Sequence, residues 1–277
     1  MELLWLGIGI GSTIAVMLPV MVVLLRRVVH RAREAEGEAR HSQRLAELGS
    51  MTGGLAHEIK NPLSTVGLNA QLLREDIAHL DVPQTERDRL THRVDALARE
   101  VDRLGHILTD FLEFAGRIRL DPQAHDLRRI VEELSDFYHP QCEQAGVVLR
   151  VDLPSTAIMA NVDEGLIKQA LLNLMINATQ VMQRERGGAD PDSVDDELIL
   201  RVESSDGMAR IHVIDTGPGV PEDMREEIFH PYVSGRKGGT GLGLPTSRRI
   251  VEEHGGRLLV ESSMGHGSDF VLSVPSS

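Results

Sequence analysis

Cysteine and aromatic residues are scarce in this 277-residue sequence, and basic residues are outnumbered by acidic ones. Cys142 is the single cysteine, which excludes an internal disulfide framework and any zinc or iron–sulfur site built from several cysteines. Aromatic residues make up 3%, and the one tryptophan, Trp5, lies in an apolar N-terminal run. With 29 Lys+Arg against 42 Asp+Glu, the net charge of -13 argues against nucleic-acid binding. The 41% of hydrophobic residues is enough for a packed core, and the length leaves room for two domains.

Charged residues are missing from one long N-terminal segment. Residues 3–25 contain none, and their number matches the roughly 20 residues that cross a bilayer as a helix. A cleaved signal peptide is the alternative, but it would begin with positive charge, whereas this run ends at Arg26 and Arg27. These arginines predict that the rest of the chain is cytoplasmic. We therefore expect residues 1–27 to be a single-pass anchor in the inner membrane, without a sensory domain ahead of it, and residues 28–44 to be a helical linker.

Two heptad patterns separated by a turn come next. Apolar residues recur at alternating three- and four-residue steps over residues 45–73 and again over residues 94–118. Pro83 lies between the two runs and predicts a turn, because proline disfavours helix in the residue before it. We expect residues 45–120 to form an antiparallel helical hairpin. One hairpin leaves its apolar stripe half covered, so pairing with a second chain into a four-helix bundle is predicted.

The first helix of this hairpin contains the segment His57-Glu58-Ile59-Lys60-Asn61-Pro62. A lone exposed histidine is usually an ordinary surface residue. Pro62, however, removes a backbone hydrogen bond and should bend the helix within one turn of His57, which a bundle does not need for its stability. Asn61 follows His57 by four residues and shares its face. The zinc-protease pattern His-Glu-x-x-His fails, because Asn61 occupies the position of the second ligand.

The pattern changes after Phe114, and the rest of the chain mixes helices with short strands. We expect helices over residues 127–144, 163–184 and 246–254, and strands over residues 147–153, 198–203, 209–214, 257–262 and 269–274. This arrangement indicates an α+β fold, with one mixed sheet covered by helices on one face. Residues 124–277 are therefore expected to be the second domain.

Three features of the second domain bear on chemistry. Asn173 and Asn177 lie one turn apart on an otherwise apolar helix, where amides are costly unless they bind something, and their oxygens suit Mg²⁺. Asp215 directly follows a strand and precedes a Gly-Pro-Gly turn. The glycine-rich residues 238–244 lead into a helix, whose N-terminus favours a polyanion. This loop fits neither the P-loop nor the dinucleotide fingerprint.

Together these segments resemble the sensor histidine kinases of two-component systems. The phosphoacceptor box is matched by residues 57–62, the asparagine box by 173–178, the first glycine box by 215–219, the phenylalanine box by 228–232 and the second glycine box by 239–244. The five motifs stand in the family order, and the resemblance extends from Leu45 to the C-terminus. It implies that the second domain is an α/β sandwich with the ATP-binding fold shared by gyrase, MutL and a heat-shock chaperone.

The resemblance implies a role for each matching residue. ATP would lie between the asparagine helix and a lid of residues 216–240, with Asp215 reading the adenine amino group and Asn177, with Asn173, holding Mg²⁺. The other nucleotide-binding residues implied are Gly217, Gly219, Phe229, Arg236, Lys237, Gly239, Thr240, Gly241, Leu242 and Gly243. The lid has Ser-Gly-Arg where the family more often has Thr-Thr-Lys, so the identity of the cation that contacts the phosphates stays open.

The implied reaction is autophosphorylation of His57 by ATP, followed by transfer to an aspartate of a response regulator. Histidine is largely neutral at cytoplasmic pH and keeps a free lone pair, while Glu58 would act as general base. Asn61 could orient a water that dephosphorylates the regulator. One alternative, an ATP hydrolase of the gyrase type, is disfavoured because Asn173 replaces the glutamate that would activate water. The other, a nucleotide-gated scaffold, is disfavoured because every motif is complete.

Overall fold

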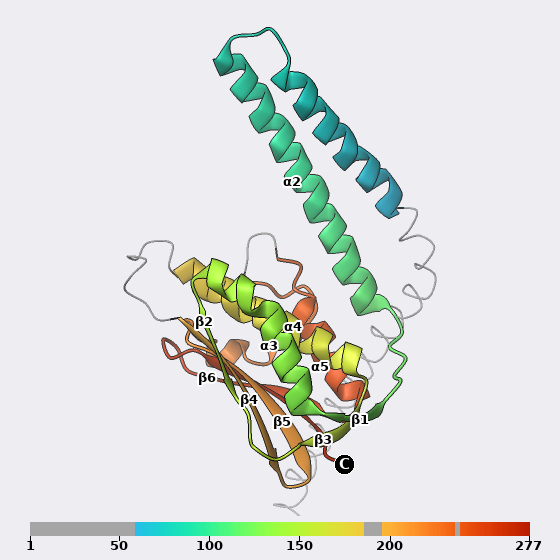
Figure 1. Ribbon diagram of the computed structural model, residues 1–277, viewed down its shortest axis with the longest axis vertical. Coiled ribbons are helices and arrows are strands. Elements are labelled where there is room, and N and C mark those ends of the chain that lie inside the picture. Colours follow the sequence, from blue (N-terminus) through green and yellow to red (C-terminus); the bar gives the residue numbers. More distant parts are fainter. Residues whose placement is uncertain (1–58, 186–195, 236–238) are drawn as a thin grey trace, which may run out of the picture.

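A helical hairpin extends from an α/β domain in this computed structural model, which describes residues 59–185, 196–235 and 239–277 (Figure 1). The expected anchor and linker lie outside these residues, as do His57 and Glu58. Among the residues described, no helix combines the length and the apolar character that crossing a bilayer requires.

The hairpin has the antiparallel form that the two heptad runs predict. A helix over residues 59–78 is followed by α2 (Gln84–Ala115), and the turn between them contains Pro83. The heptad pattern continues to residue 118, but α2 already ends at Ala115, because Gly116 is extended. Ile118 packs against the core of the second domain instead. That part of the helix prediction is therefore wrong, and Ile118 belongs to the connection between the two parts of the chain.

Many apolar side chains of the hairpin are exposed to solvent. The apolar residues that are buried in it above the last turn of α2 are Ala70, Ile77 and Val101. Exposed apolar side chains, 38–58% accessible, belong to Ile59, Val66, Leu68, Leu72, Leu73, Leu80, Leu97 and Leu104. Exposed apolar side chains in this number on one hairpin are typical of a surface that contacts another protein.

A five-stranded sheet with helices on one face forms the second domain (Figure 1). The strand order is β2 (Val148–Asp152), β4 (Glu197–Ser205), β5 (Met208–Asp215), β7 (Ser268–Pro275) and β6 (Arg257–Ser262). Only β2 and β4 pair in parallel, so the sheet is mixed, as expected. The helices are α3 (Leu127–Ala145), α4 (Glu164–Glu185) and α5 (Gly243–Glu253), with two short 3-10 helices, Glu222–Met224 and Glu227–Phe229. The α+β class is thus confirmed.

A second, two-stranded sheet was not expected. β1 (Gln123–Asp126) pairs antiparallel with β3 (Met159–Val162). Each strand has only four residues, and the polar sequence of β1 shows no alternation from which a strand could be predicted. The pairing is therefore a product of tertiary contacts.

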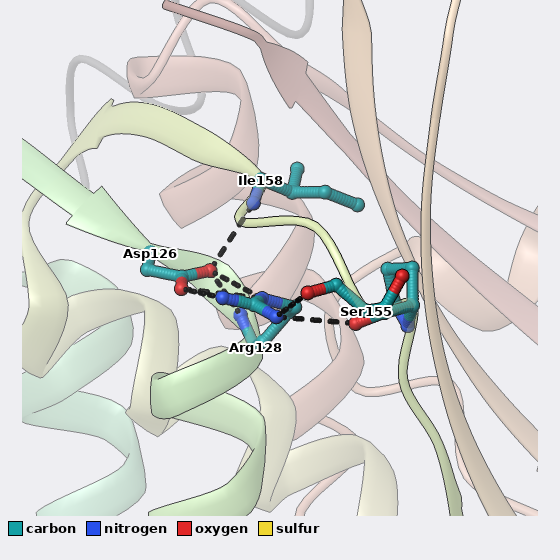
Figure 2. A network of polar contacts seen from close by, with 5 residues as sticks. Asp126, Arg128, Ser155 and Ile158 are labelled. Atoms are coloured by element: carbon teal, nitrogen blue, oxygen red, sulfur yellow. Dashed lines mark hydrogen bonds and ion pairs between the residues drawn. The ribbon is translucent and has the colours of Figure 1, made fainter.

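A polar network fixes the start of α3 beside this small sheet (Figure 2). The Asp126 carboxylate caps the helix by accepting from the Arg128 backbone N–H, and it also accepts from the Ile158 N–H at 3.2 Å. The Arg128 guanidinium binds the same carboxylate at 2.6 Å and donates to the carbonyl oxygens of Pro154 and Ser155. Two segments that are distant in sequence, residues 126–128 and residues 154–158, are thereby held together around the Arg128 side chain.

The core lies between the sheet and the three helices. Residues of β5 alternate between half-buried and buried, and the buried set is Ala209, Ile211, Val213 and Asp215. These side chains point to the face that α4 covers, where Leu171, Leu174, Met175 and Met182 are at most 1% exposed. The strand register therefore places a carboxylate, Asp215, on the apolar side of the sheet at the end of its strand.

Candidate functional site

Helix α4 lies against both glycine boxes. At the end of α4, Met182 and Val181 approach Gly217, where a Cβ atom would lie 3.4 and 3.5 Å from their side chains. Near the middle of the helix, the Asn173 amide donates to the Gly243 carbonyl oxygen at 3.4 Å. The asparagine helix thus connects the first glycine box to the second, although the two are more than twenty residues apart in the sequence.

Asp215 is the most strongly perturbed acid of the site. Asp215 is 5% exposed, and this burial raises the pKa of its carboxyl group from 3.8 to about 6. The Gly217 N–H donates to Oδ1 at 2.9 Å, and Ser268 donates through both its backbone N–H and its hydroxyl, which limits that rise in pKa. A buried carboxylate with this environment remains mainly ionised at neutral pH and suits a hydrogen-bond donor on a ligand.

The turn before β7 contributes residues that the motif analysis missed. Gly267 has a φ of 88°, and a Cβ atom there would lie 1.9 Å from the Asp215 carbonyl oxygen. Glycine therefore allows this turn to lie against the end of β5 and brings the Ser268 hydroxyl to the carboxylate. The available sequence signal was Gly-x-Gly-Ser between two alternating strands.

Gly219 connects the same turn to the first glycine box. Its φ is 80°, and a Cβ atom there would lie 2.4 Å from the Ser263 carbonyl oxygen. The neighbouring Val220 N–H donates to the Ser262 hydroxyl at 2.8 Å. The first glycine box is therefore held between α4 on one side and the turn between β6 and β7 on the other.

The second glycine box forms the entrance to α5. Gly241 has a φ of 66°, and its carbonyl oxygen accepts from the Tyr232 N–H at 3.1 Å, which closes the loop between these residues. Leu242 precedes the first helical residue, Gly243, and no side chain caps this helix end. The first N–H groups of a helix lack partners within it and carry a partial positive charge, so they favour an anion.

The other predicted site residues occupy different environments. Phe229 is 4% exposed and packs edge-on against Phe270 with ring centroids 6.3 Å apart, while the Arg248 guanidinium lies 4.6 Å from its ring centroid. The Phe229 side chain therefore anchors the middle of the predicted lid segment, residues 216–240, to the core. Gly239 and Asn61 are exposed. Arg236 and Lys237 lie outside the described residues.

The asparagine pair fits a magnesium ion that also binds phosphate. Asn173 and Asn177 are both half-buried on α4, and the amide nitrogen of Asn173 bonds the second glycine box, which orients its neutral oxygen donor. Within the described residues, no cluster of three His, Cys, Asp or Glu side chains could bind a metal by itself. Mg²⁺ usually takes few protein ligands and completes its octahedron with water and phosphate oxygens.

Two family models match the chain and cover both of its parts. Residues 47–117 match the His Kinase A (phospho-acceptor) domain, and residues 162–277 match the Histidine kinase-, DNA gyrase B-, and HSP90-like ATPase family. Sensory histidine kinase/phosphatase NtrB of Vibrio alginolyticus is 30% identical over 272 residues, which cover 92% of this chain and 70% of that protein. The chain therefore belongs to the sensor histidine kinases of two-component systems.

Other relatives are longer than this chain. Sensor histidine kinase ZraS of Klebsiella oxytoca is 30% identical over 252 residues, covering 90% of this chain but only 51% of ZraS. Among solved structures, histidine kinase ThkA in complex with the response regulator protein TrrA is similar with a TM-score of 0.59 and 26% identity, covering 88% of this chain and 66% of that one. The chain thus spans about half the length of curated relatives such as ZraS.

Proposed function

We propose that this protein phosphorylates its own His57 from ATP and passes the phosphoryl group to an aspartate of a response regulator. The observation that carries the proposal is the arrangement around α4, which contacts the buried Asp215 segment at one end and the second glycine box through Asn173. This contact supports the proposal, because one helix would then join the proposed adenine site, the proposed phosphate site and the predicted magnesium ligands.

Adenine recognition is assigned to the carboxylate of Asp215. The exocyclic amino group of adenine is a hydrogen-bond donor. It would donate to the Asp215 carboxylate, which already accepts from Gly217 and Ser268. Burial strengthens this hydrogen bond because little water competes for it. Guanine presents a carbonyl oxygen at the equivalent position, so an ionised Asp215 would select against it. Gly217 and Gly219 line the same end of the site.

The phosphates are assigned to the second glycine box. Gly239, Thr240, Gly241, Leu242 and Gly243 would present backbone N–H groups at the N-terminus of α5. Asn177, together with Asn173, would hold the magnesium ion that supplies positive charge to the triphosphate. Lid cations Arg236 and Lys237 would add to this charge. Positioning and charge neutralisation are the main demands of phosphoryl transfer.

The transfer itself is assigned to the phosphoacceptor box. A ring nitrogen of neutral His57 would attack the γ-phosphorus, forming a nitrogen–phosphorus bond while the bond to the leaving ADP oxygen breaks. Glu58 would accept the proton from the other ring nitrogen. The aspartate of the regulator would then displace the imidazole. Asn61, which is exposed on the helix of residues 59–78, would orient the water that removes phosphate from the regulator; the name of the relative NtrB includes a phosphatase.

The proposed partners are a second copy of this chain, a response regulator and a membrane. The exposed apolar side chains of the hairpin support dimerisation into a four-helix bundle, since removing apolar surface from water is favourable. The similarity to ThkA, solved with the regulator TrrA, supports a regulator as phosphate acceptor. The charge-free segment of residues 3–25 supports a single-pass anchor in the inner membrane, with the catalytic part in the cytoplasm.

A substitution of Asn177 tests the metal and nucleotide assignment. Asn177→Ala should reduce labelling of the chain by γ-labelled ATP and Mg²⁺ at least a hundredfold, because one of the two magnesium ligands on α4 is removed. Gln183→Ala on the same helix, where the side chain is exposed, should retain wild-type labelling. Circular dichroism should show the same fold for both variants. Normal labelling of Asn177→Ala would refute the assignment.

A further inference from the structure

The last two turns of α2 contact the second glycine box and α5. The Thr240 hydroxyl donates to the Asp110 carboxylate at 2.7 Å. Beside this bond, the Leu242 side chain is 1% exposed and packs with Phe111 and Phe114 in an apolar cluster separate from the main core. The contact therefore combines a charged group with an apolar anchor.

Two further hydrogen bonds hold this end of α2 against the domain. The Arg249 guanidinium of α5 donates to the Phe114 carbonyl oxygen, which has no partner further along the helix because α2 ends one residue later. The Gln169 amide of α4 donates to the Glu113 carboxylate at 2.7 Å. Side chains from α4, α5 and the glycine loop all converge on the same two turns, so the position of Asp110 is well defined.

The Asp110 contact uses groups that a polyphosphate would need. The Thr240 hydroxyl gives its proton to Asp110, and its oxygen accepts from the Leu242 N–H at 3.4 Å. Both donors belong to the loop to which the phosphates are assigned. A carboxylate also lies beside this loop, and like charges a few ångströms apart repel strongly where water is partly excluded. The docked end of α2 is thus poorly compatible with a polyanion at Thr240.

We propose that Asp110 is an electrostatic latch that opposes binding of the ATP triphosphate while the end of α2 is docked on the second glycine box. The proposal rests on the assignment of that box to the phosphates. Binding of the triphosphate releases Thr240 from Asp110. It also weakens the contact between the hairpin and the second domain, which is the proposed catalytic domain. By linkage, anything that moves the end of α2 away from the domain raises the affinity for ATP by the same factor.

A charge-removing substitution tests the latch. Asp110→Asn keeps a carbonyl acceptor but removes the charge, and Asp110→Ala removes both. Calorimetry on the 277-residue chain with Mg²⁺ and a non-hydrolysable ATP analogue should show roughly threefold to tenfold tighter binding for Asp110→Asn, and at least as much for Asp110→Ala. Asp102→Asn is the matched control, since Asp102 is exposed two turns earlier on the same helix. Its affinity should equal that of the wild type.

Adenosine separates the latch from a general change in the site. It lacks phosphates, so its affinity should be the same in wild type and in both Asp110 variants. The latch is overturned if the Asp110 variants bind the ATP analogue no more tightly than Asp102→Asn, or if adenosine gains as much as the ATP analogue. Failure of the wild type to bind the ATP analogue at all would instead overturn the proposed function and the latch with it.

Discussion

The chemistry proposed for adenine depends on one carboxylate that the fold keeps out of water. Asp215 ends a strand whose alternate residues are all buried, so the same register that places valine and isoleucine in the core also buries this acid. Burial raises its pKa, and the donors Gly217 and Ser268 keep the pKa from rising further. Burial of this carboxylate costs stability, and the cost falls at the position where Asp215 would accept a hydrogen bond from a ligand.

Adenosine binding should weaken as the pH falls through 6. The folded-state pKa of Asp215 is raised to about 6, and only the ionised carboxylate accepts a hydrogen bond fully from the adenine amino group. We expect about tenfold weaker binding at pH 5 than at pH 7, because most carboxyl groups are then protonated. Adenosine is the suitable probe because it has no phosphate that titrates in this range, and nuclear magnetic resonance titration measures the affinity.

Asp215→Asn supplies the comparison for this prediction. The amide cannot ionise, so its binding should be weak and nearly independent of pH between 5 and 7. A flat pH profile in the wild type would contradict the adenine assignment, and so would an equally steep profile in Asp215→Asn.

The local elements were largely predictable from the sequence. The 3.6-residue periodicity of α3 and the alternation of β5 each appear within one short window, and both elements form where expected. β1 and β3 were not predictable, since four residues hold too little pattern and their pairing depends on partners 33 to 39 residues away. The end of α2 was misplaced because Ile118 continues the heptad but packs on another domain.

The candidate site was predictable only where its residues belong to a local sequence pattern. Asp215, Asn173 and the two glycine boxes carry local signatures, whereas Ser268 and the Asp110–Thr240 bond depend on how separate elements meet. A hydrogen bond between residues 130 positions apart leaves no local trace in the sequence. Contacts between the hairpin and the catalytic domain could therefore be found only from the fold.

Arg128→Met should lower the free energy of unfolding of the catalytic domain. The Arg128 side chain is 24% exposed and the Asp126 side chain 12%, and the substitution removes charge-assisted bonds to Asp126 as well as bonds to two carbonyl oxygens. Urea unfolding measures the free energy. Arg129→Met is the control, because Arg129 is exposed and adjacent. Equal stability of the two variants would contradict the role of the network.

The pH dependence of that difference follows from Asp126. Hydrogen bonding by Arg128 lowers the folded-state pKa of Asp126 below its ordinary 3.8. Stabilisation from this pair is therefore fully present above pH 3.8 and is lost as the pH falls through the lower, folded-state pKa. The stability gap between wild type and Arg128→Met should accordingly shrink below about pH 4.

At the scale of the whole molecule, the two parts of the chain have different proposed roles. The hairpin carries the apolar stripe that a second copy would cover, and the catalytic domain carries the nucleotide site. The net charge of -13 gives the nucleotide no assistance, so magnesium and the N-terminus of α5 must supply the positive charge for a triphosphate. Release of the end of α2 from the glycine box would then join nucleotide binding to movement of the hairpin.

The most direct test of the central claim is the chemistry of the phosphoryl group on the chain. Incubation with γ-labelled ATP and Mg²⁺ should give a label that is labile in acid and stable in base, as expected of phosphate on a histidine nitrogen. His57→Gln should abolish it, and the matched substitution His79→Gln should retain it, because His79 is an exposed histidine directly after the helix of residues 59–78. Label that survives in His57→Gln would contradict the account.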